Sequence, residues 1–78
     1  MNQEIFERVK QVLFEHFGEI EVTYNTVAKD VEGWDSMTHM EIIADIQKEF
    51  GVKFSIADLR SFSCVGKIVD CLDAKLNG

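Results

Sequence analysis

Apolar side chains recur at the spacing of core-facing helices in three segments of the chain, residues 3–17, 36–50 and about 65–76. A helix with one apolar face must bury that face against another element. Three such segments therefore predict an all-α bundle. The residues expected to face its core are Ile5, Val9, Val12, Leu13 and Phe17 in the first segment, Ile42, Ile43, Ile46 and Phe50 in the second, and Val65, Ile68, Val69, Leu72 and Leu76 in the third.

The expected helix ends carry residues that suit them. Asn2 can cap the first helix by accepting a backbone hydrogen bond, and Ser63 is the expected cap of the last helix. Gly18 and Gly51 follow the first two long helices and can adopt the left-handed conformation that stops a helix.

Two further features lie between the long helices. Ser55 and Asp58 have the spacing of a capping box, which predicts a short helix near residues 56–61. Residues 18–35 form a loop that is long for so small a chain, and such loops are usually functional or packed by their own side chains. The side chains available for that packing are Ile20, Val22, Tyr24, Val27, Val31 and Trp34. The prediction is a bundle of three main helices plus one short helix, with a long first loop.

The length of 78 residues predicts a single small domain over residues 1–78. A chain of this size buries only about 60% of the surface that its unfolded form exposes, which leaves no room for a large catalytic cleft. The net charge of −6 argues against binding of nucleic acid, because phosphate neutralisation needs lysine and arginine.

The same composition bounds where the chain works. Two cysteines are too few for the disulfide framework of a small secreted fold. No secretory signal opens the chain, and no apolar run approaches the roughly 20 residues of a membrane span. We therefore expect a reduced, cytoplasmic domain without a membrane span, and a monomer.

The negative charge is concentrated in the middle of the chain. Residues 18–35 contain five acidic side chains and one lysine, and residues 36–50 contain three acidic side chains and one lysine. These two segments together carry a charge equal to the whole net charge of −6. Such a surface can be an ordinary solvated loop, or it can steer basic partner proteins toward the start of the second helix.

The helix expected over residues 36–50 carries a second apolar stripe. Met37, Met40 and Ala44 fall on a different side from the core residues, beside Glu41 and Asp45. Soft methionines framed by acids are typical of an adaptable docking surface. An equally weighted alternative is that these methionines pack beneath the long loop.

A short motif, Gly33-Trp34-Asp35-Ser36-Met37, ends the acidic loop and opens the second helix. Because Asp and Ser often cap helices, this pair alone indicates little. Together with residues 38–43 and Glu49-Phe50-Gly51-Val52, however, the motif resembles that of acyl carrier proteins, and the resemblance covers essentially the whole chain. In that family the motif is Asp-Ser-Leu and its serine carries 4′-phosphopantetheine. The resemblance therefore implies attachment at Ser36, between Asp35 and Met37.

The resemblance implies a carrier rather than an enzyme. A phosphopantetheinyl transferase would modify Ser36 from coenzyme A, and the thiol of the arm would hold acyl intermediates as thioesters. Partner enzymes of fatty acid or polyketide biosynthesis would load and process this cargo through basic docking patches. In this sequence, the positions that correspond to the family's recognition and cleft positions are Met40, Glu41, Ala44 and Asp45 for partner recognition, and Ile42, Ile46, Phe50, Leu59, Phe62 and Ile68 for the acyl cleft.

Other functions remain open at this point. Serine catalysis needs a positioned histidine and a third group, and neither His16 nor His39 has an evident orienting partner. An unmodified interaction module, in which Ser36 only caps its helix, is an alternative from a different class. So is a carrier of aminoacyl cargo, because Asp-Ser-Met also occurs in D-alanine carriers. Thr38, Gln47 and Lys48 stand where fatty-acid carriers often have acids, which favours a dedicated pathway.

No metal site is predicted. Residues 30–41 have the length of a calcium loop, but Trp34 occupies a ligand position and Gly33 is displaced from the position that the turn requires. Cys64 and Cys71 lie seven residues apart with no histidine near them, which is not a zinc spacing.

Overall fold

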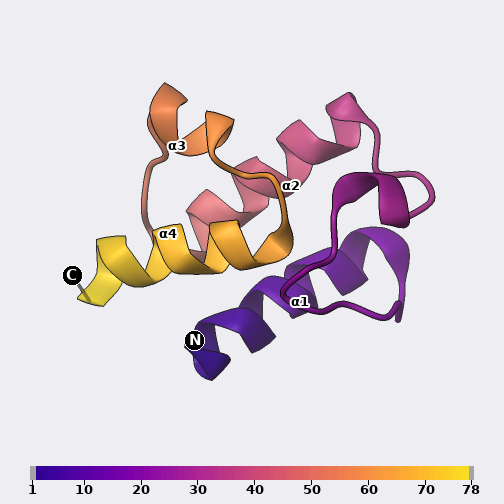
Figure 1. The fold of residues 1–78 in the computed structure, drawn as a ribbon, viewed down its shortest axis with the longest axis horizontal. Helices are drawn as coiled ribbons and strands as arrows, with labels where there is room; N and C mark the ends of the chain where they lie inside the picture. The colour runs from indigo at the N-terminus through magenta and orange to yellow at the C-terminus, as the bar shows by residue number, and fades with distance from the viewer. Residues whose placement is uncertain (1, 78) are drawn as a thin grey trace.

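The computed structural model describes residues 2–77 and consists of helices joined by loops (Figure 1). Three long helices and one short helix confirm the predicted architecture, and no strand occurs within this range. A single 3₁₀ turn, η1, was not predicted. The elements are α1 (Gln3–Phe17), η1 (Ala28–Asp30), α2 (Ser36–Phe50), α3 (Ile56–Arg60) and α4 (Val65–Asn77).

Most of the helix ends form as their residues predict. The Asn2 side chain accepts a hydrogen bond from the Ile5 backbone N–H at 3.1 Å. Gly18 and Gly51 have φ angles of +76° and +67°, a region that favours glycine, and each ends its helix. At α3 the Ser55 hydroxyl accepts a hydrogen bond from the Asp58 backbone N–H, and the Asp58 carboxylate accepts one from the Ser55 backbone N–H. This confirms the capping box.

The predicted cap of the last helix, Ser63, is wrong. Helix α4 begins at Val65, as expected, but the Lys67 N–H donates to the carbonyl of Cys64, so the residue before the first turn is Cys64 and not Ser63. The free N–H groups of this turn are satisfied by another part of the chain: Val65 donates to the Thr26 carbonyl at 2.9 Å, and Gly66 donates to the Tyr24 carbonyl at 2.8 Å. Because the first loop supplies these acceptors, α4 needs no side-chain cap.

The core lies where α1 packs against both α2 and α4. The predicted inward residues are buried with two exceptions, although Ile43 is buried outside the main cluster. Phe17 is half-buried, and Leu76 is wrong as a core residue because it is 42% exposed. Leu76 belongs to the last turn of α4, which extends past the other helices at the left of Figure 1. The buried core cluster is Ile5, Phe6, Val9, Val12, Leu13, Val22, Trp34, Ile42, Ile46, Phe50, Val65, Ile68, Val69 and Leu72.

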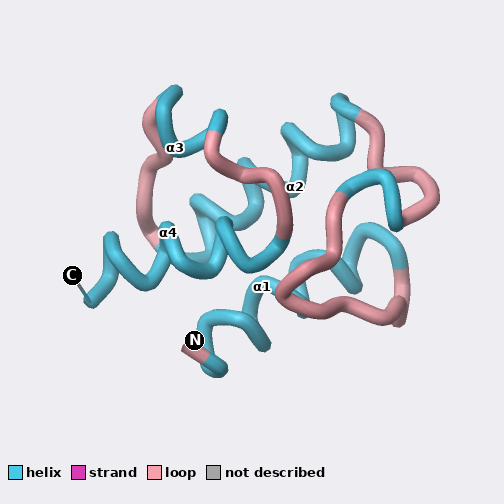
Figure 2. Tube along the Cα trace, in the orientation of Figure 1, coloured by secondary structure: helices cyan, strands magenta, loops and turns pink. Residues whose placement is uncertain are grey.

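The first loop covers one end of the bundle, at the right of Figure 2. Val22 and Trp34 are buried in the core cluster, and Ile20, Tyr24 and Val31 pack against it. The loop is therefore held by its own side chains, as predicted. By contrast, residues 51–64, which include α3, contain no buried residue.

Within the described range, none of the helices combines the length and the apolar character needed to cross a membrane.

Candidate functional site

Ser36 is the first residue of α2, and its side chain takes no part in capping that helix. The N-cap is Asp35, whose Oδ1 accepts a hydrogen bond from the Thr38 backbone N–H at 2.8 Å. Ser36 is exposed, and among residues 2–77 its hydroxyl makes no hydrogen bond. The fold therefore leaves the Ser36 hydroxyl free, at the end of a long helix.

The electrostatics at this helix start suit a bound anion. The Thr38 backbone N–H, followed by the Thr38 side chain, holds the pKa of Asp35 below its ordinary value. The backbone N–H groups of the first helical turn have no carbonyl partner within the helix, and they form the positive end of its dipole. A phosphodiester on Ser36 would lie at this positive end.

Trp34 anchors the end of the first loop next to Ser36. Its ring is buried and lies 5.6 Å from the Phe17 ring, between centroids. Its Nε1–H donates a hydrogen bond to Nδ1 of His39 at 3.0 Å. Burial lowers the pKa of His39, which keeps this ring neutral near pH 7. Trp34 and His39 together therefore connect the end of the loop to the second turn of α2.

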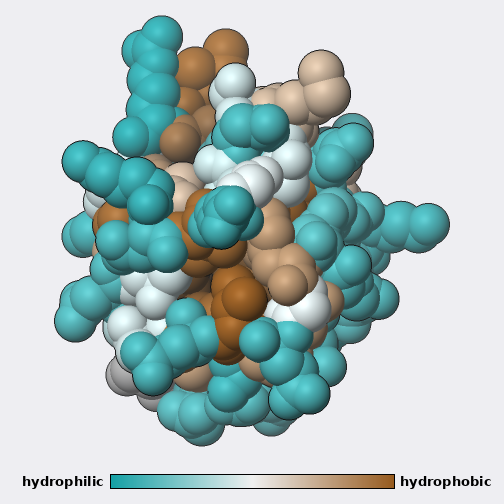
Figure 3. All heavy atoms as spheres, turned by 90° about the vertical axis from the view of Figure 1, so that its right-hand side faces the viewer, coloured by the Kyte–Doolittle hydropathy of each residue, from teal (hydrophilic) through white to brown (hydrophobic). Residues whose placement is uncertain are grey.

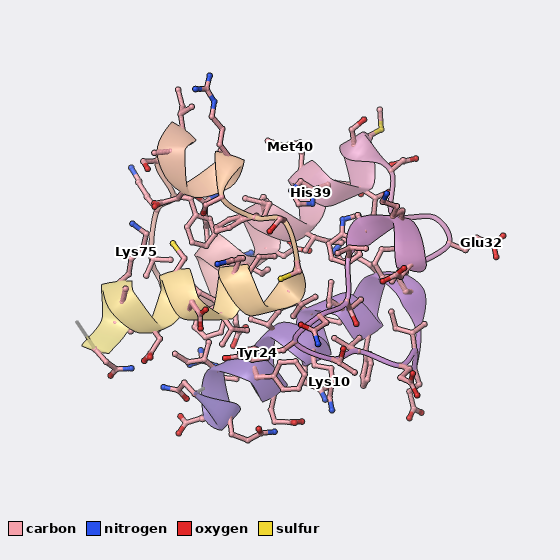
Figure 4. All side chains as sticks on the ribbon, in the orientation of Figure 1. Lys10, Tyr24, Glu32, His39, Met40 and Lys75 are labelled. Carbon is pink, nitrogen blue, oxygen red and sulfur yellow. The ribbon has the colours of Figure 1, made fainter. Side chains whose placement is uncertain are left out.

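The methionines of α2 lie on the surface. Met37 is 75% exposed and Met40 is 58% exposed, so packing beneath the long loop is excluded. Met40 points away from the bundle in Figure 4, whereas its neighbour His39 points toward the bundle. Glu41 and Ala44 are exposed as well. The second apolar stripe of α2 is therefore available to a partner.

Asp45, the fourth residue expected in partner recognition, has a partner within the chain. Its Oδ2 lies 2.7 Å from Nε2 of His16 on α1, although its side chain remains half exposed. The prediction that neither histidine has an orienting partner is therefore wrong: His16 pairs with Asp45, and His39 pairs with Trp34. Neither histidine hydrogen-bonds to Ser36 in the part of the chain that the structure describes.

The six expected cleft residues are placed in two groups. Ile42, Ile46, Phe50 and Ile68 are buried in the core, whereas Leu59 and Phe62 are half-buried near α3. Two of the six, Phe62 and Ile68, line one small cavity of about 50 Å³. The residues that complete its wall are Thr26, Ala28, Trp34, His39, Ser63, Cys64 and Val65.

Comparison with known proteins identifies the family of this site. The model of the phosphopantetheine attachment site matches residues 18–72. The chain is also 40% identical over 76 residues to an acyl carrier protein of Thermotoga maritima, a match that covers 95% of this chain and 94% of that protein. The chain belongs to the acyl carrier protein family. Proteins of this family are carriers rather than catalysts, and their cofactor is covalently attached 4′-phosphopantetheine.

Two surface features of this acyl carrier protein were not predicted from the sequence. Ile56, the first residue of α3, is 69% exposed, and a five-residue helix is too short for periodicity to show this. The second feature is an open groove of about 730 Å³ in the first loop, with Phe17, Ile20 and Val31 among its apolar residues and Glu21 and Glu32 among its acids. Figure 3 shows apolar atoms near the middle of this face with hydrophilic side chains around them, and Glu32 points outward in Figure 4.

Proposed function

We propose that Ser36 carries the 4′-phosphopantetheine arm and that this protein presents acyl groups to partner enzymes through the exposed face of α2. The observation that carries the proposal is that Asp35, and not Ser36, caps the start of α2. Asp35 caps the helix, so the exposed Ser36 hydroxyl has no structural partner to lose when it is modified.

The residues around Ser36 fit the arm. The hydroxyl is reachable by a transferase, and the positive end of α2 favours the phosphate that would be joined to it. The arm supplies a terminal thiol on which acyl cargo is held as a thioester. Ser36 anchors the arm, while Asp35 and Thr38 keep the helix start in place through their hydrogen bond. With both histidines bonded elsewhere, Ser36 has no general base and accepts the arm from a separate transferase.

The alternative of an unmodified interaction module required Ser36 to cap α2. Asp35 holds that role, so the alternative no longer accounts for a serine at this position. The carrier function accounts for both the free hydroxyl and the exposed methionines beside it. Which acyl group is carried, including an aminoacyl group, depends on the partner enzymes.

The attachment site is tested by intact-mass measurement after incubation with coenzyme A, magnesium and a broad-specificity phosphopantetheinyl transferase. We expect the parent protein to gain one phosphopantetheine and Ser36→Ala to gain none. Ser61→Ala, a change at another exposed serine, is the matched control and should be modified like the parent. Because Ser36 makes no stabilising hydrogen bond, Ser36→Ala should change the free energy of unfolding by less than about 0.5 kcal/mol. A parent protein that stays unmodified while a control carrier reacts would contradict the proposal.

The partner surface is tested by replacing an exposed apolar residue with an acid. Met40→Glu should weaken binding of the modified protein to a loading enzyme by about tenfold or more, because a desolvated methionine contact becomes a charge. Leu76→Glu makes the same chemical change at an exposed position of α4, outside the proposed face, and should bind like the parent. Equal binding by both variants would remove Met40 from the interface. Far-ultraviolet circular dichroism would verify that both variants remain folded.

A further inference from the structure

The pair formed by Trp34 and His39 determines which nitrogen of the histidine carries a proton. The Trp34 Nε1 atom lies 3.0 Å from His39 Nδ1, and the two ring planes are inclined by 27° with their centroids 6.0 Å apart. An indole N–H can donate a hydrogen bond but cannot accept one, so Nδ1 of His39 must be the acceptor. A neutral imidazole has one proton, which is therefore on Nε2.

The Nε2–H group that results is a donor with no partner in the described part of the chain. No hydrogen bond within residues 2–77 involves this atom. It is also not enclosed, because the one buried side-chain nitrogen or oxygen without a partner in that range is the Tyr24 hydroxyl. The fold thus holds an N–H donor in a fixed tautomer and leaves it accessible.

This donor lies beside the proposed attachment point. His39 follows Ser36 by three residues on α2, a spacing that places two side chains on neighbouring positions of one helix face. The His39 ring also lines the cavity of about 50 Å³ that Phe62 and Ile68 border. A group attached at Ser36 and entering this mostly apolar space would pass the histidine. A polar donor in such a wall favours ligands that bring an acceptor.

We propose that His39 donates a hydrogen bond from Nε2 to an oxygen of the group attached at Ser36, and that Trp34 is the residue that positions it. The acceptor is a carbonyl oxygen of the arm or an oxygen on the cargo. The inference rests on Ser36 as the attachment point, which is verified separately by mass. Where the acceptor is on the cargo, His39 favours an acyl group with an oxygen near the thioester over an unsubstituted alkyl chain.

The direct test is nitrogen-15 NMR of the histidine side chains in four forms of the parent protein. These are the unmodified protein, the protein with the arm alone, and the protein loaded with butyryl or with 3-hydroxybutyryl. In the unmodified form, Nδ1 of His39 should have the chemical shift of an unprotonated nitrogen and Nε2 that of a protonated one. On modification, the Nε2–H resonance should shift and its exchange with solvent should slow several-fold.

The four forms distinguish the acceptor. A change with the arm alone assigns the bond to an oxygen of the arm, and a change only with 3-hydroxybutyryl assigns it to the cargo. A protonated Nδ1 in the unmodified protein, or an unchanged Nε2–H in all modified forms of verified mass, would overturn the inference. A protein that gains no arm would instead overturn the proposed function.

Two pairs of variants test the roles of the two residues. Trp34→Phe keeps an aromatic ring and removes only the indole N–H, so a fraction of His39 should move its proton to Nδ1 and the pKa of His39 should rise. His16→Gln is the control, because it changes the other histidine and should leave these signals as they are. His39→Gln retains an N–H donor and should keep an effect on the amide resonances of a labelled arm, whereas His39→Leu should lose it. Identical arm resonances in the last two variants would exclude His39 as the donor.

Discussion

The two segments that join the long helices, residues 18–35 and 51–64, are attached to the bundle to different extents. The first places Val22 and Trp34 in the core and gives two backbone carbonyls to the first turn of α4. The second places no residue in the core. Its side chains Val52, Phe54 and Phe62 are only partly buried against the core cluster, and an ion pair of 2.9 Å joins Asp58 to Lys75 of α4.

The difference indicates which of the two segments beside the small cavity is rigid and which can open locally. Buried apolar side chains and backbone hydrogen bonds open only when the core opens, whereas partly buried side chains and solvent-accessible ion pairs can separate while the core stays folded. Residues 18–35 end at Asp35 and therefore hold the start of α2 in place. Residues 51–64 carry Phe62, one border of the small cavity, and we expect them to open at a lower free energy.

The largest expected effect separates the two segments directly. Trp34→Ala should cost about 3–5 kcal/mol of the free energy of unfolding, because it removes a buried ring from the core. Phe62→Ala removes a half-buried ring and should cost less than half as much. Urea unfolding followed by circular dichroism at 222 nm measures both changes. Equal losses would contradict the comparison.

A smaller effect is expected at the contact between the first loop and α4. A Cβ atom added to Gly66 would lie 2.9 Å from both a ring carbon and the carbonyl oxygen of Tyr24. Gly66→Ala should therefore cost about 1–3 kcal/mol, even though alanine is the better helix former. It should also speed hydrogen exchange of the Val65 N–H, whose acceptor is in the same loop. Lys67→Ala, at the next and exposed position, is the control and should change the free energy of unfolding by less than about 0.5 kcal/mol.

The smallest effect concerns α3 and depends on pH. Hydrogen bonds from Ser55, first, and then from Lys75 lower the pKa of Asp58 to about 2. Since this pKa is below the unfolded value near 4, Asp58 stabilises the fold above about pH 4, and this contribution is lost as the pH falls through about 2. Asp58→Asn should lower the melting temperature slightly at pH 7 and have a much smaller effect near pH 2, where about half of the Asp58 carboxyl is protonated in the fold. Melting curves of both proteins between pH 2 and 7 measure the difference.

The same variant sharpens the comparison through hydrogen exchange. Loss of the ion pair with Lys75 should speed exchange of the Leu59 and Ser61 amides, while the amides of Thr26 and Trp34 keep their parent rates. High salt should reproduce part of this change in the parent, because the pair is partly exposed to solvent. A uniform acceleration in both segments would mean that they open as one unit.

The sequence alone was sufficient for the features that depend on neighbouring residues. Helical periodicity, the Asn2 cap, the glycine stops and the capping box at Ser55 and Asp58 each involve residues within one or two helical turns. The motif around Ser36, together with residues 38–43 and 49–52, identified the family that the comparisons confirm.

Tertiary structure alone decided the features that depend on residues far apart in the chain. Carbonyl oxygens of the first loop, rather than the Ser63 side chain, accept the hydrogen bonds of the first backbone N–H groups of α4. Asp45 pairs with a histidine on another helix. The exposure of Met37 was undecided in the sequence, because periodicity gives the face of a helix but not what covers it. The bond from Trp34 to His39 spans only five residues, yet it forms because the core fixes the indole ring where its N–H meets Nδ1. Local patterns determine which helices form, whereas packing between distant segments determines which of their polar atoms remain free to bind.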